Sequence, residues 1–96
     1  MGGLQELRTL DLFENWFRIL PKVTYQLEKL ETLILSKNKK LEKIDDEILQ
    51  LKNLEILECD QCSSLEYPPY AVCQQEFNDI KEYLLDIVSG KRNWAT

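Results

Sequence analysis

The apolar positions between residues 27 and 48 change their spacing within one short unit. The unit opens with four leucines at intervals of 3, 3 and 2 residues, Leu27, Leu30, Leu33 and Leu35. Neither an amphipathic helix nor a plain strand has this spacing. The last two leucines flank a single residue, as the inward positions of a short strand do, and Asn38 then marks a turn. Because apolar residues return at Leu41, Ile44 and Ile48, the unit is predicted to be a strand, a turn and an apolar return segment.

This unit occurs three times along the chain. Leu4, Leu27 and Leu51 occupy equivalent places, at intervals of 23 and 24 residues. The matching segments are Leu7–Pro21, Leu30–Ile48 and Leu54–Val72. They resemble leucine-rich repeats, whose periods of about 20 to 29 residues bracket these intervals. The resemblance implies an α/β solenoid, a short right-handed horseshoe with three parallel strands on the concave side and turns or short helices behind.

The three repeats are predicted to occupy residues 1–68. Their approximate boundaries are residues 4–26, 27–50 and 51–68. Pro68 and Pro69 end the strand pattern, since each proline removes a backbone donor.

A helical pattern follows the two prolines. Apolar residues recur every three or four positions from Val72 to Val88, which predicts a C-terminal capping helix over residues 69–90 and a tail over residues 91–96. This region is similar to the C-terminal caps of intracellular leucine-rich repeat proteins, including scaffold proteins and those that carry Roc-type GTPase domains. Such caps have glycine where this chain has Glu76, so we predict one continuous helix.

The N-terminal end shows no capping pattern. Leu4 already belongs to the apolar pattern of the first repeat. Either the chain is a fragment of a longer array, or another chain covers the first strand. An uncovered strand edge presents free N–H and C=O groups, so the second interpretation includes a homodimer in which two first strands pair.

Composition and charge narrow the choice of partners. The 96 residues are 44% hydrophobic and 30% charged, as in an ordinary globular domain. The net charge of −5 argues against nucleic acid or an anionic membrane as partner, because both attract clustered basic residues. No run is long and apolar enough for a transmembrane helix, and the first 20 residues carry charges where a signal peptide needs an apolar centre. Three cysteines, an odd number, also fit a cytoplasmic protein.

Few residues could support catalysis or metal binding. The chain has no histidine, and its three glycines form no phosphate-binding loop. Cys59 and Cys62 have CxxC spacing, but only Cys73 remains as a further thiol, and a structural zinc site needs four ligands. We therefore predict a protein that is not an enzyme, with no metal site and no cofactor.

The resemblance also implies structural roles for residues at the turns. Asn15 and Asn38 stand where leucine-rich repeats carry an asparagine whose amide bonds the turn backbone of neighbouring repeats. Cys62 takes this place in the third unit, and Cys59 takes an inward strand position. Both cysteines are expected to be buried structural thiols.

The open face of the predicted sheet is the remaining candidate for function. Alternation along the strands assigns nine side chains to it, in three rows: Thr9, Thr32 and Ile56; Asp11, Ile34 and Glu58; and Phe13, Ser36 and Asp60. Three of them, Phe13, Ile34 and Ile56, form a diagonal apolar stripe with carboxylates beside it. An apolar centre with a charged rim is common in protein-binding surfaces, although isolated apolar residues are also ordinary on any protein surface.

These nine residues are predicted to form the partner-binding site. The chain is then a non-enzymatic protein–protein interaction module that binds a partner protein or peptide on the concave sheet face. Two alternatives stay open. The chain is the repeat segment of a larger intracellular signalling protein, for example a Roc-type GTPase, or it is a self-associating scaffold.

Overall fold

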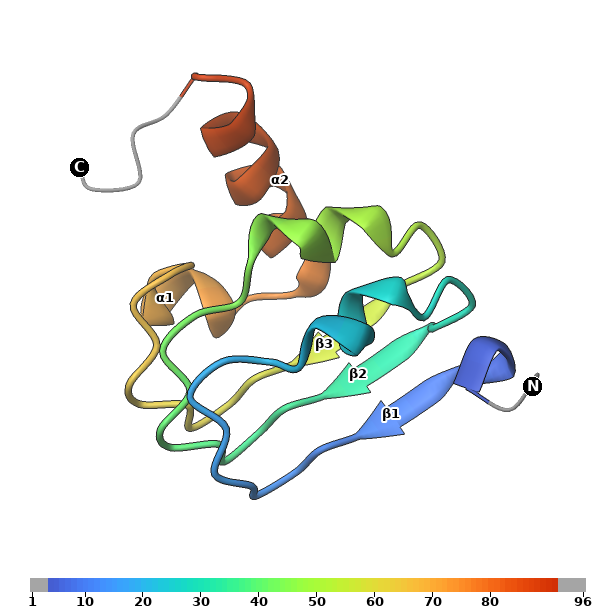
Figure 1. Cartoon of the computed structure of the whole chain (residues 1–96). Coiled ribbons are helices and arrows are strands. Elements are labelled where there is room, and N and C mark those ends of the chain that lie inside the picture. Colours follow the sequence, from blue (N-terminus) through green and yellow to red (C-terminus); the bar gives the residue numbers. More distant parts are fainter. Residues whose placement is uncertain (1–3, 92–96) are drawn as a thin grey trace.

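Three short strands form one parallel sheet in the computed structural model, which describes residues 4–91. They lie in chain order across the sheet (Figure 1) as β1 (Thr9–Asp11), β2 (Thr32–Ile34) and β3 (Ile56–Glu58). Thr9 pairs with Thr32, and Thr32 with Ile56, so equivalent residues of the three units lie side by side. The prediction of three parallel strands in this register is confirmed.

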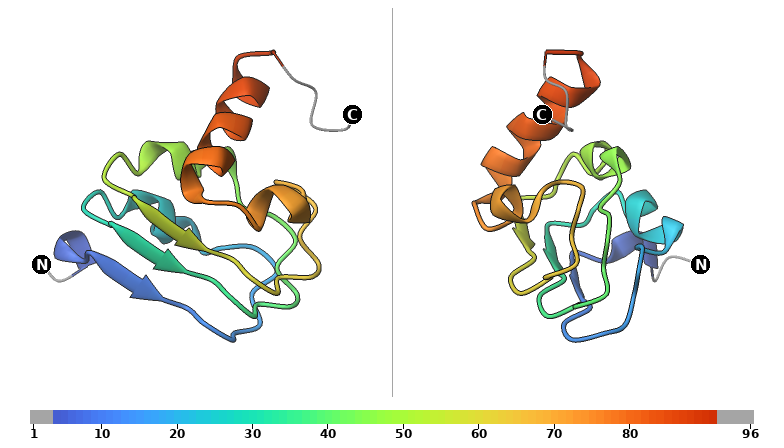
Figure 2. Two further views of the ribbon diagram at one scale, coloured as in Figure 1. Left: turned by 180° about the vertical axis from the view of Figure 1, so that it is seen from behind. Right: turned by 90° about the vertical axis from the view of Figure 1, so that its left-hand side faces the viewer.

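The return segments form a second layer behind the sheet (Figure 2). Two of them contain 3-10 helices, η2 (Lys22–Gln26) and η3 (Asp46–Gln50), and a third 3-10 helix, η1 (Leu4–Glu6), precedes β1. Single parallel bridges join Ile19 to Lys43 and Lys43 to Tyr67. The three units therefore pair twice, once through the strands and once through the return segments.

The hydrophobic core lies between the two layers and is most completely enclosed in the second unit. Six side chains of that unit have no exposed surface: Leu30, Leu33, Leu35, Leu41, Ile44 and Ile48. On the strand side of the first unit, the counterparts Leu7, Leu10 and Leu12 are only partly buried, because no element within residues 4–91 pairs with the outer edge of β1. The core side chains of a unit are thus fully enclosed when the unit has neighbours on both sides, and those on its strand side stay partly exposed when it has one neighbour.

Asn38 connects neighbouring units as predicted, whereas Asn15 does not. The Asn38 amide nitrogen donates to the Leu35 carbonyl at 2.7 Å and to the Leu12 carbonyl of the first unit at 2.8 Å. The Cys62 thiol donates across the next boundary to the same Leu35 carbonyl at 3.1 Å. Asn15 is exposed and bonds within its own turn, to the carbonyls of Leu12 and Phe13. These bonds satisfy carbonyl groups at the carboxyl ends of the strands.

Each turn bends at a left-handed residue immediately before the position of Asn15, Asn38 or Cys62, which we call the ladder position. The residues and their φ angles are Glu14 (58°), Lys37 (64°) and Gln61 (59°). None is glycine, although this conformation costs other residues roughly 1–2 kcal/mol. The same strained bend therefore recurs in all three units, and the side chain that follows it holds the turn in place.

The C-terminal region differs from the prediction of one continuous helix. It forms α1 (Tyr70–Cys73) and α2 (Phe77–Val88), and Glu76 is extended between them, with φ −74° and ψ 161°. The break lets Phe77, Ile80 and Leu84 turn into the core beside η3 and β3. Of the predicted tail over residues 91–96, only Lys91 lies within the described residues.

Helix α1 occupies the place of a third return helix. Pro69 precedes it with φ −54° and ψ 146°, close to the angles of Pro21 before η2 and of Asp45 before η3. Only α2, with 12 residues, is then an added element at the β3 end of the sheet. Within residues 4–91, every helix is too short or too polar to cross a membrane.

Candidate binding surface

The predicted rows of the open sheet face are present in the structure. Two rows follow directly from strand pairing, which places Thr9 beside Thr32 and Ile56, and Asp11 beside Ile34 and Glu58. The third row continues the register past the strands. Its backbone bonds run from the N–H of Glu14 to the Ser36 carbonyl and from the N–H of Lys37 to the Asp60 carbonyl.

Ser36 does not belong to the accessible surface, contrary to the prediction. Only 7% of it is exposed. Its hydroxyl oxygen accepts a hydrogen bond from the N–H of Asp60 at 3.2 Å, because the chain begins to bend toward the left-handed Lys37 at this point. Side chains alternate between the two faces of the sheet only as far as the strand continues, and the turn begins after Ile34. The alternation therefore predicted the wrong environment for Ser36.

The diagonal apolar stripe is present but uneven. Ile56 is 47% exposed and Phe13 is 45% exposed, whereas Ile34 between them is partly buried. The Lys37 ammonium lies 5.5 Å from the centre of the Phe13 ring, which places a cation beside one end of the stripe. The accessible apolar surface of the sheet face therefore lies at the two ends of the stripe, at Phe13 and at Ile56 on β3.

Carboxylates lie on both sides of this stripe. Asp11 is exposed on β1, and one of its oxygens accepts from the N–H of Phe13 at 3.0 Å. Glu58 and Asp60 are exposed at the β3 side. None of the three forms an ion pair within residues 4–91. Their charges are thus available to a basic partner.

The three cysteines are buried and not disulfide-bonded. The Cys59 thiol donates to the Cys73 carbonyl at 3.2 Å. A hydrogen bond with the Cys73 side chain and then burial raise the pKa of Cys59, and burial raises the pKa of Cys62. Raised pKa values disfavour the thiolate, which is the reactive form. Among the described residues, no group of three or more metal-ligating side chains is placed to hold an ion.

A groove beside β3 was not predicted. One wall is the strand segment of residues 55–60, and the other comprises Cys73 and residues 75–78, where α1 passes into α2. Its volume is about 330 Å³. The spacing of the repeats gave no signal for it, because the groove depends on the break at Glu76 that separates the two helices.

Two tyrosines join the return segments to each other. The Tyr25 hydroxyl oxygen accepts from the N–H of Asp45 at 2.9 Å, and the Tyr67 hydroxyl donates to the Asp46 carboxylate. Burial raises the pKa of Tyr25 to about 12, although the bond from Asp45 acts in the opposite direction. Burial, and then the bond to Asp46, raise the pKa of Tyr67.

We expect Tyr25 to make the stability depend on alkaline pH. Its pKa is higher in the folded chain, about 12, than the reference value of 10.0, so its contribution is complete below pH 10 and is lost as the pH rises toward 12. The free energy of unfolding should fall by about 1 kcal/mol between pH 10 and 11 from this residue. Urea unfolding of the wild type and of Tyr25→Phe at pH 7 and pH 11 measures it. The variant should be less stable than the wild type at pH 7, and its free energy of unfolding should approach that of the wild type at pH 11. If the difference between the two proteins were the same at both pH values, Tyr25 would not be the cause of the pH dependence.

The chain matches none of the protein-family models, curated proteins and solved structures with which it was compared.

Proposed function

We propose that the chain is a leucine-rich repeat solenoid that acts as a non-enzymatic protein-interaction module. The observation that carries the proposal is the open face of the sheet, where Ile56 and Phe13 expose apolar surface beside the carboxylates of Asp11, Glu58 and Asp60. Backbone pairing in two layers supports this surface rigidly. A rigid apolar patch with charged neighbours suits recognition of a protein or peptide.

The β3 side of this face should contribute most of the affinity. Ile56 is its most exposed apolar side chain, and Glu58 and Asp60 are charged neighbours that carry no ion pair within the described part of the chain. The partner should therefore offer apolar groups flanked by basic ones. Interface energies are concentrated in a few such residues rather than spread over the whole contact.

Selection from a displayed peptide library, followed by affinity measurement, tests this surface. A variant with Ile34→Ala, Ile56→Ala, Glu58→Lys and Asp60→Lys should bind the selected peptides at least about tenfold more weakly. The matched control carries the same charge reversals on the return segments, Glu42→Lys and Glu66→Lys, with the exposed Val23→Ala. Thermal melting of both variants confirms that they fold. Equal losses of affinity in the two variants, or none in the first, would show that another surface binds.

A second function, self-association, is favoured by one specific observation. The first unit has a partly open core at Leu7, Leu10, Leu12 and Phe17, and β1 has an edge that pairs with no other strand of residues 4–91. If the β1 strands of two copies paired in antiparallel fashion, the dimer would cover both the partly open core and the unpaired strand edge. Light scattering across the micromolar range should then show a dimer that dissociates on dilution, and Thr9→Pro should weaken it by removing an edge donor. A monomer at every concentration would exclude this function.

A further inference from the structure

The outer edge of β3 is an unpaired strand edge that faces the groove. Backbone bonds from β2 reach alternate residues of the third unit, as shown by the N–H of Leu35 bonding to the Glu58 carbonyl and that of Lys37 to the Asp60 carbonyl. The residues that alternate with them, Leu57 and Cys59, therefore direct their N–H and C=O groups to the other side. No strand within residues 4–91 pairs there.

The groove lies beside this edge. Six consecutive residues, 55–60, contribute to one wall. The opposite wall contains Cys73 and Phe77, whose side chains are buried. The groove therefore offers backbone partners on one side and, on the other, the exposed polar residues Gln75, Glu76 and Asn78, with which an added strand can form hydrogen bonds.

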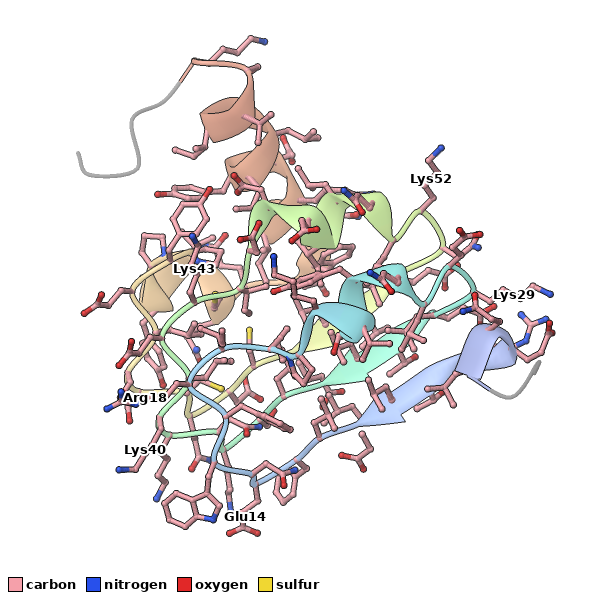
Figure 3. All side chains as sticks on the ribbon, viewed as in Figure 1. Glu14, Arg18, Lys29, Lys40, Lys43 and Lys52 are labelled. Carbon is pink, nitrogen blue, oxygen red and sulfur yellow. The ribbon has the colours of Figure 1, made fainter. Side chains whose placement is uncertain are left out.

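The charge of the lining selects the occupant. Four of the residues that line the groove are acidic, Glu55, Glu58, Asp60 and Glu76, and none is lysine or arginine. In Figure 3, Arg18 and Lys40 lie at the turn end of the sheet, and Lys29 and Lys52 lie at the opposite end. A cation does lie near the groove, since the Lys81 ammonium is 5.6 Å from the centre of the Phe77 ring. The acidic residues of the lining outnumber this cation, so the groove complements a positively charged segment.

We propose that this groove binds an extended, lysine- or arginine-containing peptide segment of a partner protein, which adds to the sheet as a fourth strand beside β3. The backbone of Leu57 and Cys59 holds the segment, and the carboxylates around the groove contact its basic side chains. The site shares Ile56, Glu58 and Asp60 with the sheet face but does not depend on the rest of that face. It is therefore tested through residues that lie outside the face.

A synthetic peptide provides the probe. An acetylated and amidated heptapeptide of alternating lysine and valine should bind, as measured by fluorescence anisotropy at low salt, and should shift the amide NMR signals of Leu57, Cys59 and Asn78. The same peptide with N-methylated valines should lose most of its binding, because it cannot pair with a strand edge. A peptide with glutamate in place of lysine should not bind.

Variants of the chain complete the test. Glu55→Gln with Glu76→Gln should weaken binding about fivefold, a modest effect because both carboxylates are exposed. The control is Glu14→Gln with Glu42→Gln, which removes the same charge away from the groove. Ile34 lies on the sheet face but outside the groove, so the Ile34→Ala variant should bind the peptide normally. The experiments can therefore reject the groove site without rejecting the sheet face as a binding surface, and the reverse.

Three results would overturn the proposal. They are equal binding of the N-methylated peptide, equal loss in the control variant, and NMR shifts confined to other elements. The competing occupant of this edge is a second copy of the chain. If the NMR signals of Leu57 and Cys59 shift with rising protein concentration in the absence of peptide, the edge pairs with that second copy instead.

Discussion

Asn38→Asp is expected to remove a large part of the stability of this chain. The Asn38 amide is completely buried and donates to two carbonyl oxygens, of Leu12 and Leu35. A carboxylate of the same shape cannot donate, and it places a negative charge against both oxygens. We expect a loss of about 3–5 kcal/mol in the free energy of unfolding, out of a total that is typically 5–15 kcal/mol for a domain.

Asn15→Asp is the matched control for this change. Asn15 occupies the equivalent position in the first unit, but its side chain is exposed and water can replace its bonds. Its loss should stay below about 1 kcal/mol. Urea unfolding followed by circular dichroism measures both variants. The Asn38→Asp protein should also recover stability relative to the wild type as the pH is lowered, because the protonated carboxyl can donate again; similar losses in the two variants would mean that the ladder bonds contribute little.

Leu35→Ala should produce the second large effect. Leu35 has no exposed surface and lies at the centre of the enclosed second unit. Removing its side chain loses the burial of three carbons and leaves a cavity that the neighbouring strands prevent from collapsing. We expect a loss of about 3–4 kcal/mol, measured by urea unfolding.

Leu12→Ala makes the same change at the equivalent position of the first unit. Leu12 is only partly buried, so less apolar surface is lost and solvent can enter the space. The loss should be about 1–2 kcal/mol. If it equalled that of Leu35→Ala, the first unit would be covered in solution, and the loss should then depend on protein concentration as self-association requires.

The parts of the fold that depend on periodic spacing could be predicted. The intervals of 23 and 24 residues were enough to place Leu10 beside Leu33 and Leu57, and the ladder position was enough to anticipate the interunit bond of Asn38. Spacing gives the register because equivalent residues of stacked units must be neighbours. It did not locate the break at Glu76, since the apolar positions of a helix can continue in phase across an extended residue.

The candidate surface was predictable for the strands and less so beyond them. Alternation placed Ile56 and Glu58 on the open face, where both are exposed, but it failed for Ser36 because the turn has already begun there. The groove beside β3 could not be predicted at all. It lies between elements whose relative position is decided by the packing of Phe77 and Cys73, and this packing has no repeat to reveal it.

The left-handed turn of the second unit links its folding to that of the first unit. In an isolated unit, local preference opposes the bend at Lys37 by roughly 1–2 kcal/mol. Asn38, which holds that bend, obtains one of its two bonds from the Leu12 carbonyl, which belongs to the preceding unit. The first turn is held within its own unit by Asn15, but the second is complete only when the first unit is in place, so the first two units form together. Closing the loop between them is the entropic barrier of the first step.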